Sequence, residues 1–268
     1  MPRSSASDLL WRAVCALCLL SFPPGLAAYS VSPSLLHLRP TGQGASAFLH
    51  LTNRTARPVA LDIAVHPHGR DLEGRALPLP REEASDDILV YPSQLVLLPG
   101  DAASAQIRWI GPPALDRERA YTLVTRQVPI PRDQAEPEPS DALRIDVTVL
   151  MNYEVRLYVT PPGAAPRIAV ESVSAHASAP DDPEASLEIM LHNLGTARIS
   201  LAEKSLRLTS ATATRGGPTA TVPAAEVPAL KTPILAGERR RVIIPRPASL
   251  PPGALRASLV DPPGNLPR

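Results

Sequence analysis

The chain has 268 residues, of which 27 are basic and 26 acidic, so its formal net charge is +1. This balance argues against nucleic acid or an anionic membrane surface as the main partner, because such partners favour a strongly basic protein. Aromatic residues make up 3% of the chain, which disfavours a sugar-binding surface, since sugars usually bind by stacking on aromatic rings.

The N-terminus is predicted to be a secretory signal peptide. Arg3 and Arg12 lie near the start, and the apolar run 13–22 is followed by a Pro-Pro-Gly breaker. The small residues Ala27 and Ala28 then offer a cleavage site. The apolar run is too short to span a membrane, which takes about 20 apolar residues, and no later segment is long enough.

Both cysteines of the chain, Cys15 and Cys18, lie inside this signal. The exported protein is therefore free of cysteine and cannot rely on disulfides, although an oxidising compartment would permit them. Loss of the signal also removes Arg3, Arg12 and Asp8, so that the exported chain is formally neutral.

The region 29–130 is predicted to be a series of short β-strands. Apolar and polar residues alternate over short runs, and turn residues separate these runs. Pro33 interrupts the first run, which places it at a sheet edge. The expected strands are 29–38, 45–52, 59–65, 88–98, 105–109 and 120–130. With no helical period present, this pattern indicates an antiparallel immunoglobulin-type β-sandwich.

The run 143–159 is predicted to be one very long strand. All nine odd-numbered positions are apolar and six of the eight even-numbered ones are polar, which places the apolar side chains on one face of a strand. Seventeen residues would span roughly 55 Å, whereas strands usually have about 5–6 residues. Two interpretations are open: the strand is satisfied within its own domain, or part of its apolar row serves a partner chain by strand addition.

A stiff linker, 160–166, is expected to lead into a second and smaller β-domain. Its predicted strands are 167–173, 187–191, 199–208 and 239–245. The chain as a whole is thus predicted to be all-β, with a signal peptide at 1–28 and immunoglobulin-like β-sandwich domains at 29–160 and 161–268.

Nothing in the sequence indicates an enzyme or a bound cofactor. The pair His66 and His68 has a spacing that metal ligands can have, but no further ligand stands at a recognisable distance. We interpret this segment as a polar turn after a strand and expect no metal site. Nucleophile elbow, phosphate-binding loop and zinc-helix motifs are not found in the sequence.

Three segments in this order and spacing give the chain a resemblance to a known family. They are ILVYPSQLVLLPGDAASAQIRW at 88–109, DRERAYTLVTRQVPI at 116–130, and the long run 143–159. With them the chain resembles the periplasmic pilus chaperones of the chaperone–usher pathway. The second domain, with LEIMLHNLGTARISL at 187–201 and ILAGERRRVIIP at 234–245, is more similar to the archaic or alternative branches of that family.

The resemblance implies a boomerang of two immunoglobulin-like domains that works in the periplasm without a cofactor. The clients implied are pilus subunits whose own fold lacks its last strand. The chaperone lends its long strand to such a subunit and releases it at an outer-membrane usher. A client-free chaperone exposes an apolar strand edge, so a self-capping homodimer is also expected.

The resemblance also implies a set of site residues. The apolar side chains that enter the subunit correspond to Val147, Val149 and Met151, and Arg156 corresponds to the cation that binds the subunit's terminal carboxylate. A guanidinium suits this role because it donates two parallel hydrogen bonds to a carboxylate.

Two positions depart from the family pattern. His37 stands where the familiar branch has a second arginine for the carboxylate, and Arg126 is an alternative second cation. Glu118 matches one partner of the family's cross-domain ion pair, but Thr160 stands at the position of the other. The competing hypothesis, drawn from the residues alone, is a secreted adhesin or carbohydrate-binding module whose function lies in its loops.

Overall fold

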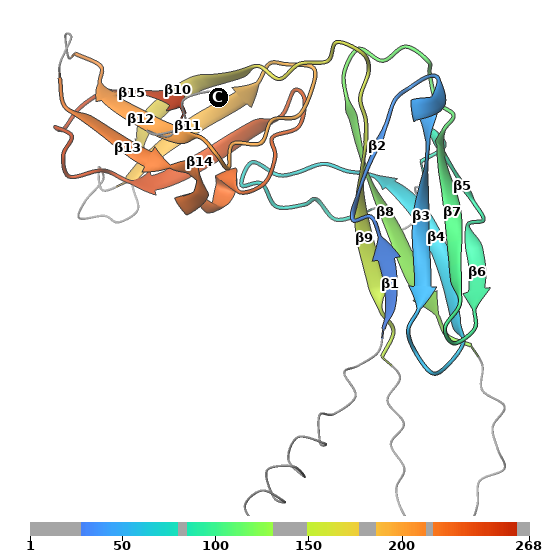
Figure 1. Ribbon diagram of the computed structural model, residues 1–268. Helices are drawn as coiled ribbons and strands as arrows, with labels where there is room; N and C mark the ends of the chain where they lie inside the picture. Colours follow the sequence, from blue (N-terminus) through green and yellow to red (C-terminus); the bar gives the residue numbers. More distant parts are fainter. Residues whose placement is uncertain (1–27, 80–84, 131–148, 177–185, 213–216, 262–268) are drawn as a thin grey trace, which may run out of the picture.

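The computed structural model describes residues 28–79, 85–130, 149–176, 186–212 and 217–261. These residues form β-strands with a few short 3-10 turns, arranged as two β-sandwiches that meet at an angle (Figure 1). The predicted all-β class and the boomerang of two immunoglobulin-like units are confirmed. Within the described residues, no helix is long and apolar enough to cross a membrane.

The described residues of the first half form a four-stranded and a five-stranded sheet. The four-stranded sheet runs in the order β1 (Tyr29–Ser32), β3 (Ser46–Asn53), β7 (Ala102–Trp109) and β5 (Ile88–Tyr91). The five-stranded sheet runs in the order β2 (Leu35–Leu38), β9 (Asn152–Val159), β8 (Arg119–Val128), β4 (Val59–Pro67) and β6 (Gln94–Leu97).

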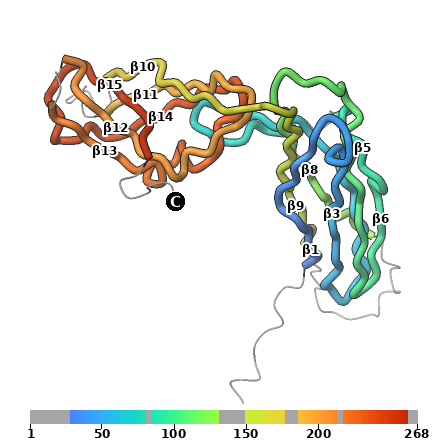
Figure 2. Tube along the Cα trace, turned by 45° about the horizontal axis from the view of Figure 1, so that its top comes forward, coloured from blue at the N-terminus to red at the C-terminus, as the bar shows by residue number. Residues whose placement is uncertain are grey.

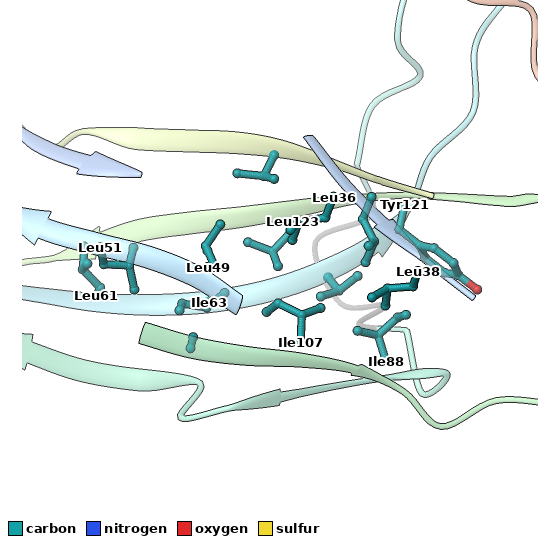
Figure 3. Close-up of a cluster of buried hydrophobic side chains, with 14 of the residues drawn as sticks. Leu36, Leu38, Leu49, Leu51, Leu61, Ile63, Ile88, Ile107, Tyr121 and Leu123 are labelled. Atoms are coloured by element: carbon teal, nitrogen blue, oxygen red, sulfur yellow. The ribbon is translucent and has the colours of Figure 1, made fainter. Parts of the chain in front are cut away.

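The core of this half lies between its two sheets. Every second residue of the central strands points inward and is buried, as in Leu49 and Leu51 of β3 or Leu61 and Ile63 of β4 (Figure 3). This is the alternation that the sequence predicts, because successive side chains of a strand point to opposite faces of its sheet.

Two predicted strands are each divided at a proline. The chain passes from one sheet to the other at Pro33, between β1 and β2, and again at Pro92, between β5 and β6. Proline has no backbone N–H to donate to a sheet and is therefore found at strand ends and edges. The prediction of an edge position for the first strand is confirmed, but single strands over 29–38 and 88–98 are wrong.

The second half contains two three-stranded sheets around a separate core. One sheet has the order β10 (Ile168–His176), β11 (Ser186–Asn193) and β14 (Arg239–Pro245); the other has β13 (Thr219–Pro223), β12 (Ser205–Ser210) and β15 (Leu255–Val260). In the described residues the remaining elements are 3-10 turns: η1 (Gln43–Ala45) in the first half, and η2 (Ala224–Glu226) and η3 (Pro228–Leu230) in the second.

Sequence reasoning was less accurate in this half. The predicted strand 199–208 begins only at Ser205, and Ile199 instead makes an isolated bridge to Ile234. Strands β13 and β15 were not predicted. Their sequences, TATVP and LRASLV, do alternate, but each run has only five or six residues and prolines stand beside it, so the signal is weak.

The long strand expected at 143–159 is shorter than predicted. Strand β9 covers Asn152–Val159, and residues 149–151 lie outside any strand. Residues 143–148 lie outside the described part of the chain. A strand of 17 residues is therefore not observed, and the apolar row divides into a buried part and an exposed part.

The segment 68–77, which follows β4, joins the two halves. It leaves the first sandwich and reaches the second beside β14, as the cyan stretch of chain in Figures 1 and 2 shows. The carbonyl of Leu72 accepts a hydrogen bond of 2.7 Å from the backbone N–H of Arg241. This segment therefore braces the angle between the halves.

Candidate functional site

Strand β9 has two faces of different character. Its odd-numbered side chains, Tyr153 to Val159, pack into the core of the first half. The even-numbered side chains Glu154, Arg156 and Tyr158 alternate with them and therefore lie on the other face of the sheet. This second face looks toward the second half of the chain, because the guanidinium of Arg198 lies 3.8 Å from the centre of the Tyr158 ring.

One edge of β9 is only partly paired within the described residues. Strand β2 runs parallel to it, but the register pairs Leu35 to Leu38 only with positions 156 to 159. The preceding residues, Asn152 to Val155, pair with β8 alone. Among the described residues no strand pairs with their outward backbone groups, and such an open strand edge is a template for pairing with another chain.

The residues before β9 carry exposed apolar side chains at this open edge. Val149 is 64% exposed and Met151 is 38% exposed. They continue the odd-numbered row of Tyr153 and Val155 beyond the end of the core. Val147, the third residue predicted to insert into a subunit, lies outside the described residues.

The main chain at Met151 is held in place although its side chain is exposed. The backbone of Met151 accepts a hydrogen bond of 3.2 Å from the backbone N–H of Gln127 and donates one of 3.2 Å to the side chain of the same glutamine. The hydroxyl of Tyr29 lies 3.2 Å from the Met151 carbonyl. These hydrogen bonds fix the backbone of Met151, the residue at which the exposed apolar row meets β9.

Arg156 lies at the centre of the face that looks toward the second half. Its Nη1 donates to Thr122 Oγ1 at 3.0 Å and lies 3.4 Å from Glu154 Oε2. The side chain is 31% exposed. The guanidinium is therefore anchored on its own sheet while part of it stays open to an incoming group.

His68 lies beside this arginine and not in a polar turn. Both His66 and His68 are buried. Strand β4 continues to Pro67, and the backbone N–H of His68 donates to the carbonyl of Ala120. The interpretation of this segment as a polar turn is wrong. Burial, reinforced by the charges of Arg156 and Arg70, lowers the pKa of His68 to about 4, so its ring is neutral at pH 7.

Arg70 is a second cation near Arg156 that sequence reasoning missed. Burial and the charge of Arg156 lower the pKa of Arg70, whereas Tyr158 and Glu238 act in the opposite direction. The Nη1 of Arg70 donates to the Gly74 carbonyl at 2.8 Å. No sequence signal marks this arginine, because it approaches Arg156 only through the path of segment 68–77.

The sequence offered two candidates for the second cation, His37 and Arg126, and they lie at different distances from Arg156 along the sheet. His37 pairs with Tyr158, two positions further along β9. Its Nδ1 lies 3.4 Å from Arg198 Nη2, and burial and that arginine lower its pKa. A largely neutral His37 can contribute a hydrogen bond but little charge.

Arg126 is further from Arg156 than His37 is. Thr122 pairs with Arg156 in the register, and Arg126 is four residues beyond Thr122 on β8, which corresponds to roughly 13 Å along the strand. Its Nη2 lies 3.5 Å from His66 Nε2. The structure therefore brings His37, His68 and Arg70 toward Arg156, but it directs Arg126 toward His66.

A cross-domain ion pair is present with a partner that the sequence did not reveal. The carboxylate of Glu118 is buried and forms a salt bridge with Arg198 of the second half. It also accepts a hydrogen bond of 2.7 Å from Thr160 Oγ1 and one of 3.1 Å from the backbone N–H of Arg198. The threonine thus supports the pair, and the arginine comes from the turn after β11.

The bracing segment 68–77 rests on a buried arginine of β14. Arg240 is fully buried and donates to the carbonyls of Ala229 and Pro233 at 2.6 and 3.1 Å. Its Nη1 also donates to Thr232 Oγ1 at 3.0 Å, and this hydroxyl donates to the carbonyl of Gly74 at 3.2 Å. The arginine therefore organises the surface on which the segment lies.

Among the described residues, no group of three or more histidine, cysteine, aspartate or glutamate side chains is placed to hold a metal ion. The potential metal ligand His68 instead lies 3.1 Å from Thr122 Oγ1 through its Nδ1. The site thus combines the guanidinium groups of Arg156 and Arg70 with the neutral imidazole of His68, on the sheet that also carries the partly paired edge of β9. Its chemistry suits an anionic group on an extended chain.

No protein-family model matches the sequence, and no curated protein matches it either. Solved structures, in contrast, match over most of the chain. The class 5 fimbriae chaperone CfaA is 13% identical with a TM-score of 0.50, covering 87% of this chain and 99% of that chain. The E. coli chaperone DraB is 16% identical with a TM-score of 0.50, covering 83% of this chain and 86% of that chain.

A third match is the CsuC–CsuE complex of a chaperone with a tip subunit, from the archaic chaperone–usher Csu pili of Acinetobacter baumannii. It is 12% identical with a TM-score of 0.50 and covers 88% of this chain and 98% of that chain. At these identities the likeness establishes the fold. The chain has the two-domain immunoglobulin-like fold of these fimbrial chaperones.

Proposed function

We propose that this protein is a periplasmic chaperone that binds pilus subunits by lending them a β-strand. The observation that carries the proposal is the exposed apolar pair Val149 and Met151 at the open edge of β9. An apolar row beside unpaired backbone groups is what an incomplete immunoglobulin-like sheet needs for its missing strand.

The energetics fit a reversible complex. Burying one such side chain contributes roughly 1.5–3 kcal/mol, so Val147, Val149 and Met151 together supply enough to hold a subunit while still permitting its release. Backbone hydrogen bonds to the open edge of β9 set the register of the added strand. No cofactor or catalytic residue is required, because folding of the subunit and better packing of its groove supply the free energy.

Arg156 provides the second recognition element. It stands a few residues beyond the apolar row, in the cleft between the halves, and its guanidinium donates hydrogen bonds well to a carboxylate. We assign it to the terminal carboxylate of the subunit, with His37 as the further donor. Arg126, the alternative second cation that the resemblance suggests, lies four residues along β8 from the position opposite Arg156. The fold shared with the chaperone of the CsuC–CsuE complex supports a pilus subunit as the partner.

The remaining steps follow from the same assignment. The signal peptide at 1–28 directs the chain to the periplasm, and the domains 29–160 and 161–268 form the two arms of the cleft. The subunit is delivered to an outer-membrane usher, where another subunit's strand replaces β9. Without a client, two copies cap each other's open edges, which light scattering on the isolated protein would reveal as a dimer.

Affinity purification from the periplasm tests the proposal. We expect an immunoglobulin-like subunit that lacks its last strand to co-purify with the chain. Specific binding of glycans by the isolated protein, with no such subunit in the eluate, would instead support the adhesin or carbohydrate-binding alternative.

A further inference from the structure

The pairing between β8 and β9 ends before β8 itself does. Strand β8 continues to Val128, which pairs with Ala60 of β4, but in the described part of the chain its pairing with β9 stops at Arg126 and Asn152. If the register continued, Val128 would lie opposite Leu150, and these side chains are 42% and 40% exposed. An apolar cross-strand pair is favourable, so a specific feature must end the pairing here.

Gln127 interrupts the first hydrogen-bonded pair beyond this point. The two residues of such a pair in an antiparallel ladder exchange both N–H···O bonds between their main chains. The backbone N–H of Gln127 donates to the Met151 carbonyl at 3.2 Å, as this pattern requires. The N–H of Met151, however, donates to Gln127 Oε1 at 3.2 Å. The side chain of Gln127 therefore takes the hydrogen bond that its own main-chain carbonyl would accept in a continuing ladder.

Pro129 interrupts the next hydrogen-bonded pair. Such pairs recur at every second residue, so the pair after Gln127 and Met151 would be Pro129 and Val149. Proline has no backbone N–H and cannot donate to the Val149 carbonyl. Neither Val149 nor Leu150 has a cross-strand partner in the described residues. Two successive positions of β8 thus each remove one of the bonds that would continue the ladder.

We infer that Gln127 and Pro129 form a strand stop that keeps the β8 side of Val149 and Leu150 free. The inference rests on the proposed function, and it adds the residues that set where the lent strand begins. A strand that fills a gap between two strands of another sheet pairs along both of its edges. Val149 has both edges free, whereas Asn152 is already paired with β8. Met151 therefore marks the end of the stretch that a subunit can enclose from both sides.

Hydrogen exchange on the isolated full-length protein tests the strand stop without a subunit. In a double variant, Gln127→Leu removes the competing side-chain oxygen and Pro129→Val supplies the missing N–H. Pro129 is exposed, so its replacement disturbs no core packing. We expect the ladder to extend and the Val149 amide to exchange about tenfold more slowly than in the wild type, as measured by NMR. Unchanged exchange at Val149 would overturn the inference.

Subunit binding by the same double variant tests the consequence. A subunit has to break the extended pairing before it can take up the strand, so we expect binding of a purified subunit to weaken by about tenfold. Stability in urea should equal or exceed that of the wild type, because the variant gains backbone hydrogen bonds. A purely structural role of Gln127 and Pro129 would instead lower stability and binding together. Normal binding by a variant with a protected Val149 amide would contradict the inference.

Two single variants serve as controls. Gln127→Glu keeps a side-chain oxygen that accepts from the Met151 N–H, so we expect wild-type exchange at Val149 and wild-type binding. Gln106→Leu makes the same replacement as in the double variant, but on β7 of the other sheet, and should also match the wild type. A Gln127→Glu variant that behaves like the double variant would show that the side-chain oxygen does not stop the ladder.

Subunit capture by a Val149→Asp variant separates this inference from the proposed function. If that variant loses capture while the double variant binds normally, strand lending stands and the strand stop is wrong. If the Val149→Asp variant captures subunits normally, the proposed function is wrong, and the hydrogen exchange of Val149 alone then decides whether Gln127 and Pro129 end the ladder.

Discussion

Arg198, in the second half of the chain, forms a salt bridge with the buried carboxylate of Glu118 in the first half. The same guanidinium lies over the Tyr158 ring, whose residue is next but one to Arg156 on β9. Arg198 therefore connects the second half of the chain both to Glu118 and to strand β9, which carries the candidate site. Its loss should affect stability as well as the geometry of the cleft.

We expect Arg198→Ala to lower the free energy of unfolding by about 2–4 kcal/mol, because removing one partner of a buried pair leaves a buried charge without compensation. Urea unfolding at neutral pH measures this change. Arg207, an exposed arginine of β12, is the control, and Arg207→Ala should change stability little. Equal stability of both variants would mean that the Glu118–Arg198 pair does not hold the halves together.

Segment 68–77 is predicted to tolerate no side chain at Gly74. This glycine has a φ of 84°, and a Cβ atom there would lie 2.3 Å from Nη1 of the buried Arg240. Gly100 has a similar φ of 81° but no atom within 4 Å of its would-be Cβ, so the two glycines share the backbone strain and differ in the clash.

Gly74→Ala should therefore be less stable than Gly100→Ala by roughly 1–3 kcal/mol, the usual cost of overpacking. Urea unfolding of both variants gives the comparison. Similar losses of stability in the two variants would show that the segment does not pack against Arg240 as described.

The buried neutral state of His68 predicts a pH dependence of stability. Its folded pKa of about 4 lies below the ordinary value of 6.5. As pH falls through 6.5, the unfolded chain binds a proton that the folded chain refuses, so stability is lost down to pH 4. The loss from this group between pH 7 and pH 5 is about 2 kcal/mol.

The same measurement on His68→Phe isolates this contribution from the other titrating groups. We expect the variant to lose about 2 kcal/mol less than the wild type between pH 7 and pH 5. An identical pH dependence of the two proteins would place the folded pKa of His68 near its ordinary value.

Arg156→Glu should weaken the complex with a subunit by about 2–5 kcal/mol, the usual scale for disrupting a buried charged contact. Titration calorimetry with a purified subunit measures the affinity. Arg108→Glu, on an exposed position of β7 in the other sheet, is the charge-matched control and should bind normally. Normal binding by the Arg156 variant would contradict the assignment of Arg156 to the subunit's terminal carboxylate.

The sequence predicted the strands better than it predicted their contacts. Alternation identified β3, β4 and β7 because one side of each strand is more buried than the other, and a two-residue period records this difference directly. Strand β8 is buried on both sides from Tyr121 to Thr125, and its polar residues Thr122 and Thr125 lie within the protein. Pro33 was recognised as an interruption, but its role as the crossing point between sheets depends on where both sheets lie.

The site was predictable only where its residues share one strand. Arg156 and Met151 belong to the same alternating run, and the structure places Arg156 on β9 and Met151 directly before that strand. Arg70 and Arg198 come from turns far away in the sequence, and their positions depend on how the two halves pack. Local patterns carry no signal for such contacts. Thr160 was therefore found where an arginine partner of Glu118 was expected, and the sequence did not predict that Arg198 supplies this partner.

The most direct test of strand lending is subunit capture by a Val149→Asp variant with two controls. Leu150→Asp changes the even-numbered neighbour, whose side chain would point away from the subunit's groove, and Tyr91→Asp changes an apolar residue that is 72% exposed on the other sheet. Co-purification of the subunit with each variant is measured after their folding has been verified by circular dichroism.

We predict that Val149→Asp abolishes capture of the subunit, while Leu150→Asp and Tyr91→Asp retain it. Normal capture by the folded Val149→Asp variant would contradict the claim that this strand completes the subunit's fold.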